Sequence, residues 1–124
     1  MPYTTGLITN TRATGTAASN IAVSVRNLGT LAATIIVEIF AVPITTLTLV
    51  PVYVSGYTVA GGAADIREFF IAGNVSYEVQ ISNTDGMSKV AFSSFGLDEF
   101  GNLVTEQRVL QSEFTPIDVF SWPI

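Results

Sequence analysis

Residues 74–82 have the sequence Asn-Val-Ser-Tyr-Glu-Val-Gln-Ile-Ser, and this stretch decides the fold class. Large apolar residues occupy every second position, with polar residues between them. Side chains of an extended chain alternate between its two faces, so this period of two predicts a strand with one face in a core. The apolar face holds Val75, Tyr77, Val79 and Ile81, and the polar face holds Ser76, Glu78, Gln80 and Ser82.

The same alternation recurs along most of the chain. It is clear at 21–26 and 34–42, and β-rich segments follow at 46–55, 65–71, 89–97 and 103–114. Turn sequences separate these segments, and Gly101 is placed for a positive φ in the loop before the last one. Pro51 predicts an edge strand or a bend. We therefore predict a single all-β domain, an antiparallel β-sandwich of Greek-key or jelly-roll type with roughly seven to eight strands.

The two ends of the chain differ from its body. Residues 1–19 consist mostly of Thr, Gly, Ala, Ser and Asn, and we predict an extended N-terminal arm or connector with a short strand near 6–12. The sandwich domain is predicted at residues 20–124, and its C-terminal segment 117–124 is too apolar for a free tail. Chain ends fray unless they are anchored, so we expect the arm to dock onto a neighbouring molecule.

Composition excludes several kinds of chemistry. The chain has no cysteine and no histidine, which removes disulfides, thiolate chemistry, the usual zinc sites and Ser-His or Cys-His nucleophiles. Its net charge of −5 disfavours nucleic-acid binding. The apolar stretch 35–42 is interrupted by Glu38 and is too short for membrane insertion. Only 12% of the residues are charged while 48% are hydrophobic, a balance that favours self-association.

The remaining candidate sites have structural interpretations. A catalytic carboxylate pair must face across a cleft, whereas Asp98 and Glu99 are neighbours in a predicted hairpin loop. Their spacing also differs from that of a calcium-binding EF-hand loop. We therefore expect no catalytic residues, no metal and no cofactor. Aromatic rings such as Tyr57 and Trp122 would suit stacking on sugars, which keeps a glycan-binding module as an alternative.

Two groups of residues are predicted at a subunit interface. In the arm they are Leu7, Ile8, Thr9 and Arg12. In strand 34–42 Ile36 and Phe40 point away from the core set Ile35, Val37 and Ile39, so a second subunit or the arm is expected to cover them. A slipped register or a bulge would be the alternative explanation. The apolar C-terminal segment adds Phe120, Trp122 and Ile124.

Several segments together resemble a known group of proteins. These are residues 23–30 leading into 33–40, then 66–81, then 90–103 with 107–117. The pattern is similar to the small β-sandwich proteins of the spore surface in spore-forming Firmicutes, and to subunits of their extracellular appendage fibres. The resemblance covers residues 20–117. The Asn-x-Gly-Thr turn at 27–30 also resembles bacterial Ig-like adhesion modules.

The resemblance implies a structural role. It implies a subunit that is made in the cytoplasm without a signal peptide and ends on the cell or spore surface, where it forms a fibre or layer. In the appendage fibres an N-terminal connector reaches a neighbour and cysteines seal the contact, so a chain without cysteine would assemble non-covalently. The expected partners are further copies of the chain and a surface anchor protein. A glycan-binding or adhesin module is the alternative, and a viral capsid or tail jelly roll is the third.

Overall fold

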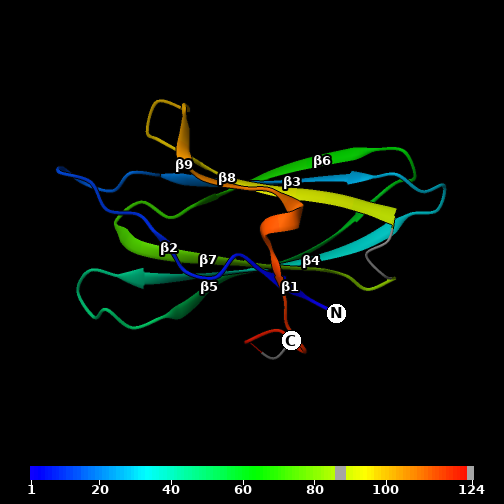
Figure 1. The fold of residues 1–124 in the computed structure, drawn as a ribbon, viewed down its shortest axis with the longest axis horizontal. Helices are drawn as coiled ribbons and strands as arrows, with labels where there is room; N and C mark the ends of the chain where they lie inside the picture. Colours follow the sequence, from blue (N-terminus) through cyan, green and yellow to red (C-terminus); the bar gives the residue numbers. More distant parts are fainter. Residues whose placement is uncertain (86–88, 123–124) are drawn as a thin grey trace.

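The computed structural model describes residues 1–85 and 89–122, and two antiparallel sheets pack face to face (Figure 1). This confirms the predicted all-β sandwich. In the first sheet the order is β10-β1-β7-β4-β5, and β2 also pairs with β7. Its strands are β1 (Tyr3–Thr4), β2 (Ile8–Thr9), β4 (Ala33–Pro43), β5 (Val50–Val59), β7 (Asn74–Asn83) and β10 (Thr115–Pro116).

The second sheet has the order β6-β3-β8-β9. Its strands are β3 (Asn20–Asn27), β6 (Ala64–Phe70), β8 (Val90–Leu97) and β9 (Leu103–Val109). A short 3-10 helix, η2 (Gln111–Glu113), follows β9 and ends the predicted strand 103–114 early. Gly101, with a φ of 81°, lies in the loop between β8 and β9 as predicted.

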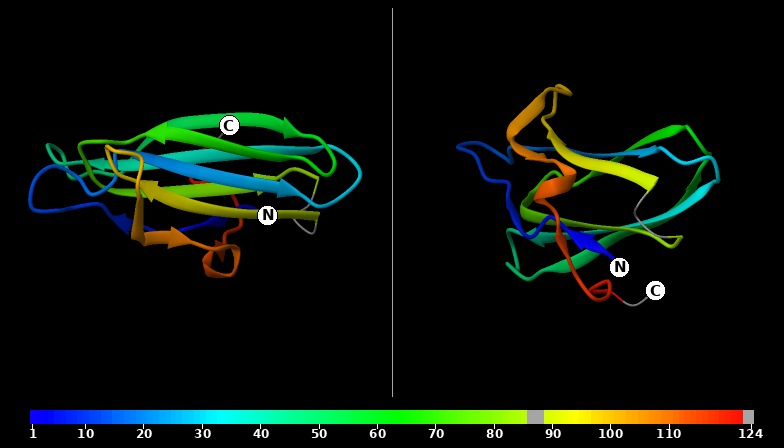
Figure 2. Two further views of the ribbon diagram at one scale, coloured as in Figure 1. Left: turned by 90° about the horizontal axis from the view of Figure 1, so that it is seen from above. Right: turned by 45° about the vertical axis from the view of Figure 1, so that its right-hand side comes forward.

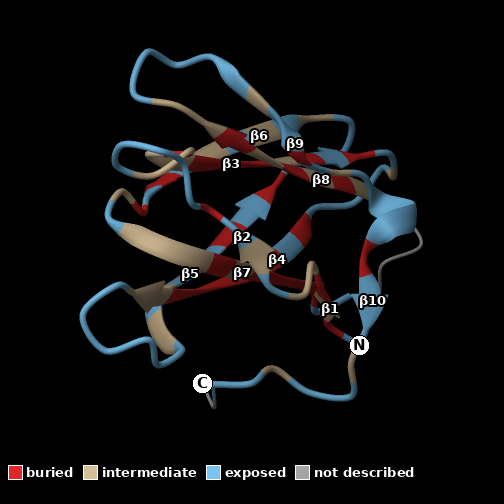
Figure 3. Cartoon of the chain, turned by 60° about the vertical axis from the view of Figure 1, so that its left-hand side comes forward, coloured by how far each residue is buried: buried red, intermediate tan, exposed pale blue. Residues whose placement is uncertain are grey.

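The core lies between the sheets and is built from the alternate positions that the sequence marks as apolar. Buried residues follow the strands, and exposed residues lie mainly in the loops (Figure 3). Burying one such side chain stabilises the fold by about 1.5–3 kcal/mol before entropic costs. Fully buried members include Ile21, Val23 and Val25 of β3, Ile35, Val37 and Ile39 of β4, and Tyr77, Val79 and Ile81 of β7.

Strand β5 is an edge strand, as Pro51 predicts. Among the described strands it pairs only with β4, and the register shifts between Ile39 and Phe40, where Phe40 lies opposite Pro51. This bulge does not turn Phe40 toward the core. In the pairing of β4 with β7, Phe40 lies opposite Glu78, whose side chain points away from the core. The second face of β4 therefore carries an aromatic ring.

Residues 1–19 are anchored within their own chain, which corrects the expectation of an arm with few anchors. Figure 2 shows this N-terminal segment lying against the domain. Strands β1 and β2 both pair with β7, and β1 also pairs with β10. The reason is that backbone pairing and buried polar groups hold the segment, rather than the large apolar side chains on which the expectation was based.

Candidate self-association surfaces

The N-terminal residues complete an open edge of β7. Tyr3 and Thr4 lie opposite Ile81 and Gln80, and Ile8 and Thr9 lie opposite Tyr77 and Ser76. Two further backbone bonds run from Thr5 N to Val79 O at 3.0 Å and from Asn10 N to Val75 O at 2.8 Å. Without residues 3–10, this edge of a largely buried strand would present unpaired backbone groups.

Asn10 is the buried anchor of this segment, and its side chain is fully enclosed. Its Nδ2 donates to Ala18 O at 3.1 Å and to Asn74 O at 3.0 Å. Its Oδ1 accepts from Ala18 N at 2.7 Å and from Gln107 Nε2 at 2.8 Å. Buried polar groups are stable only when they are paired, and here one amide satisfies four partners.

Gln107 extends this network into the core. Its Nε2 also donates to Thr9 O at 3.2 Å, and its Oε1 accepts the Tyr77 hydroxyl at 2.8 Å. Burial raises the pKa of Tyr77 well above its usual range, so the hydroxyl stays a donor. Gly96 makes room for Gln107, because a Cβ at position 96 would lie 2.0 Å from Gln107 Oε1. Sequence reasoning missed this network, since nothing in the sequence separates Asn10 or Gln107 from exposed amides.

The predicted arm residues lie in different environments. Ile8 is half-buried and packs against the core, whereas Thr9 is exposed and Leu7 is 62% exposed. Arg12 makes a bidentate ion pair with Glu99 of the β8–β9 loop, with Nη1 and Oε1 2.9 Å apart. The hydrogen bond from Arg12 lowers the pKa of Glu99. Both groups are exposed, so the pair fixes position more than it adds stability.

An exposed connector joins this segment to β3. Residues 11–15 are exposed, Gly15 has a φ of 70°, and Thr11 and Thr16 form an isolated bridge. The chain is pinned again at Ala18, which is buried, and at Ser19, whose N–H donates to Leu97 O at 2.7 Å. A short polar loop on the surface therefore connects residues 1–10 to the start of β3.

The second face of β4 is covered by the C-terminal segment of the same chain. Phe40 is 3% exposed and Glu38 is fully buried, whereas Ile36 is half-buried. Residues 117–122 run along this side of the first sheet (Figure 3). Their backbone donates from Trp122 N to Glu38 Oε1 at 3.3 Å, and from Ser121 N to Gln80 Oε1 at 2.9 Å.

Phe40 is buried within the described chain, which corrects the expectation that a second subunit is needed to cover it. The backbone of residues 121 and 122 bonds to Gln80 and Glu38 on the same face. Phe120 is half-buried and Trp122 is 47% exposed, and Trp122 shares a shallow hollow with residues 51–54 of β5. Ile124 lies outside the described residues. A contact of Ile36, Phe120 or Trp122 with a second subunit stays a prediction.

Glu38 is an unusual component of this face. Burial raises its pKa, and the hydrogen bond from Trp122 N only partly opposes that shift. Its Oε2 has no hydrogen-bond partner among the described residues. Burial disfavours the charged form of a carboxyl, so Glu38 takes up its proton at a higher pH than an exposed glutamate does. Glu38 thus links the docking of the C-terminal segment to pH.

The candidate chemical sites have structural roles. Asp98 Oδ1 accepts from Phe100 N at 2.9 Å and from Asn102 N at 2.8 Å, which holds the hairpin loop. Tyr57 is 8% exposed, and the Arg67 guanidinium lies 3.8 Å from the centre of its ring. That ring is thus not open to a sugar. Burial raises the pKa of Tyr57 to about 12.

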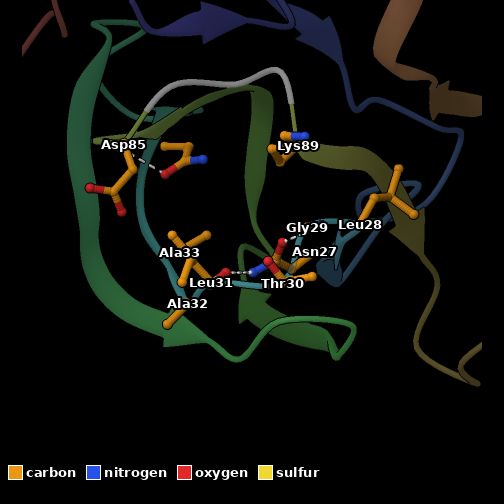
Figure 4. Close-up of a pocket in the computed structure, with 10 residues that line it drawn as sticks. Asn27, Leu28, Gly29, Thr30, Leu31, Ala32, Ala33, Asp85 and Lys89 are labelled. Atoms are coloured by element: carbon orange, nitrogen blue, oxygen red, sulfur yellow. Dashed lines mark hydrogen bonds between the residues drawn. The ribbon is translucent and has the colours of Figure 1, made fainter.

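One pocket lies among the loops at the end of the sandwich (Figure 4). Asn27 organises it by donating from Nδ2 to Leu31 O at 2.8 Å and to Val59 O at 3.0 Å, and by accepting from Gly29 N at 2.9 Å. Asp85 and Lys89 supply its charges. The Asn27 amide is thus used in holding the turn at residues 27–31 and the neighbouring end of β5.

Residues 1–85 and 89–122 contain no group of three or more acidic side chains close enough to hold a metal ion. The helical structure within these ranges includes no segment long and apolar enough to cross a membrane. No protein-family model, curated protein or solved structure matches the chain.

Proposed function

We propose that the chain is a structural subunit that assembles with copies of itself by exchanging residues 1–10. The observation that carries the proposal is the pairing of residues 3–10 with the edge of β7, joined to the domain by the exposed loop 11–15. The N-terminal segment of one copy can fill the β7 edge of the next with the same hydrogen bonds. Such exchange is a low-cost route to assembly, because the contacts of residues 1–10 form again on the next copy and only contacts within the hinge, such as the Thr11–Thr16 bridge, are lost.

The geometry of exchange sets its outcome. If two copies exchange reciprocally, a closed dimer forms, and if each copy donates to the next, an open polymer forms. With no cysteine in the chain, either assembly is held non-covalently, by strand pairing, by the Asn10 network and by the packing of Ile8 against the core. A non-covalent fibre or layer on a cell or spore surface, as the resemblance implies, is the form that we propose.

The test uses a cysteine pair placed across the exchanged strand. Thr9 and Ser76 lie directly opposite each other, and opposite residues in antiparallel strands are about 4.5–5.5 Å apart at Cα, which suits a disulfide. Under oxidising conditions Thr9→Cys/Ser76→Cys should give a ladder of covalent multimers on a denaturing, non-reducing gel. A monomer band alone would show that residues 1–10 stay on their own domain, and would overturn the proposal.

A second cysteine pair serves as a control for disulfides that form within one chain. Thr34 and Thr58 are opposite residues on β4 and β5, which are consecutive strands of one sheet. Thr34→Cys/Thr58→Cys should therefore close within each chain and run as a monomer under the same conditions. Deleting the arm is a poorer test, because the deletion also exposes the β7 edge and removes Asn10 from the core.

A further inference from the structure

The outer face of the second sheet is uncovered in the described chain. Here β3 contributes small side chains, Ala22 and Ser24, between strands that carry larger apolar groups. On β6 Ile66 is 70% exposed and Phe70 is 64% exposed. The small residues of β3 leave a shallow groove between β6 and β8. By contrast, residues 117–122 cover part of the outer face of the other sheet (Figure 1).

Two opposite charges lie on this face and have no ion-pair partner among the described residues. They are Arg26 on β3 and Glu68 on β6, and both are exposed. Arg26 lies opposite Ala64, whereas Glu68 lies opposite Ala22, four residues away along β3. Four residues of extended chain span about 13 Å, so the two groups are too far apart to pair within one copy. Arg108 lies at the β9 margin of the face, beside Phe95.

We infer that a second copy of this chain packs face to face on this sheet, related by a two-fold axis that crosses the strands at Ser24. Such an axis reverses the strand direction, so position 26 of one copy faces position 22 of the other. Arg26 then lies across from Ala22 of the second copy, one strand away from Glu68 of that copy. Because the axis is two-fold, the ion pair forms twice.

The same axis also brings apolar side chains together at the centre of the face. At its centre, Ile66 of one copy faces Ile66 of the other. Position 20, which lies between Phe70 and Leu97, falls opposite position 28. Leu28 follows the last residue of β3 and is 61% exposed. Ile66 therefore meets Ile66, Phe95 meets Ala91, and Arg26 and Glu68 meet their opposites, whereas Leu28 meets Asn20 and Leu97 meets Lys89 at the ends of the face.

The size of the face sets the strength of the contact. Four strands about 4.8 Å apart and roughly eight residues long cover on the order of 500 Å². A stable interface buries about 800 Å² on each partner, so this contact is weak by itself. It gains strength when subunits are already held together, because linkage raises their effective concentration. The inference thus adds a second contact to the proposed self-assembly, and the two contacts can be tested separately.

The test is a charge exchange in the full chain, with self-association measured by analytical ultracentrifugation. Arg26→Glu and Glu68→Arg should each weaken self-association about tenfold, because each places like charges together. The double variant Arg26→Glu/Glu68→Arg should return to within about threefold of the parent. Both residues are exposed, so circular dichroism spectra should stay unchanged. Asp118→Arg, on the C-terminal segment, repeats the charge change of Glu68→Arg and should have no effect.

Several outcomes would overturn the inference. The inference fails if the single variants self-associate as tightly as the parent. It also fails if the double variant self-associates no more tightly than the single variants. A parent chain that sediments as a monomer up to about 1 mM would also exclude the contact. Failure of the proposed exchange is distinguishable, because the Thr9→Cys/Ser76→Cys ladder reports residues 1–10 whatever this face does. A ladder of multimers together with charge variants that associate like the parent would support the exchange of residues 1–10 and exclude the face contact.

Discussion

Replacing Asn10 by Ala should destabilise the fold more than any other single change in residues 1–19. The side chain makes four hydrogen bonds, two donated by Nδ2 and two accepted by Oδ1. Truncation leaves the Ala18 N–H without its side-chain acceptor and removes the Nδ2 donor from the Asn74 and Ala18 carbonyls, of which Ala18 O keeps the Thr16 hydroxyl. Gln107 Nε2 keeps only Thr9 O. Each buried polar group left unpaired costs about 1–3 kcal/mol.

Water can enter the vacated space and recover part of this loss. We therefore expect the free energy of unfolding to fall by about 3–5 kcal/mol, a large share of the 5–15 kcal/mol that is typical of a domain. Urea unfolding followed by circular dichroism measures this change. The slope against urea should stay constant, because the same surface is exposed on unfolding.

Two further variants separate the causes. Thr11→Ala changes an exposed neighbour and should alter the free energy of unfolding by less than about 0.5 kcal/mol. Asn10→Asp keeps the shape but turns a charged acceptor toward Ala18 O and Asn74 O, so it should cost at least as much as Asn10→Ala. A loss below about 1 kcal/mol for both Asn10 variants would refute the view that this network anchors the segment.

Two other predictions concern the packed interior. The pKa of Glu38 is raised in the folded state, so its stabilising contribution is full below the unfolded pKa and is lost as pH rises through the folded pKa. Glu38→Gln should remove that part of the pH dependence, and urea midpoints that change equally with pH in both proteins would contradict this. Gly96→Ala should lower the free energy of unfolding by about 2–4 kcal/mol, because the new Cβ displaces Gln107 from the Tyr77 hydroxyl. Gly56→Ala, where the nearest atom is 3.9 Å away, is the control and should be close to neutral; equal losses at both positions would count against a steric cause.

Much of the fold follows from the period-two pattern. The pattern at 74–82 predicts β7 and its core face, and the turn at 98–102 predicts the β8–β9 hairpin. The polar face of β7 is not the solvent-facing surface that alternation suggests, because Gln80 and Ser82 are buried. Pro51 correctly predicts an edge strand. Strand ends were less predictable, because β9 stops at Val109, where η2 satisfies the next backbone groups in another way.

The candidate site shows where such reasoning ends. Phe40 was recognised on the second face of β4, but a second subunit or residues 1–19 were predicted to cover it, and the burial of Phe40 within the described chain was not foreseen. The apolar residues of 117–124 were recognised as well, yet nothing local connects them to Glu38 and Gln80. Side-chain alternation assigns residues to faces without saying which segment packs on each face.

The sequence by itself determined that this chain is a sparsely charged antiparallel sandwich without histidine or cysteine chemistry, because residue types and their spacing are local properties. Only the tertiary structure decided that residues 3–10 complete the β7 edge, that Asn10 is buried, and that the C-terminal segment bonds to Glu38 and Gln80. The physical reason is that backbone pairing and buried hydrogen bonds depend on which segments meet in space. An asparagine in a polar loop and an asparagine that holds an edge strand have the same appearance in the sequence.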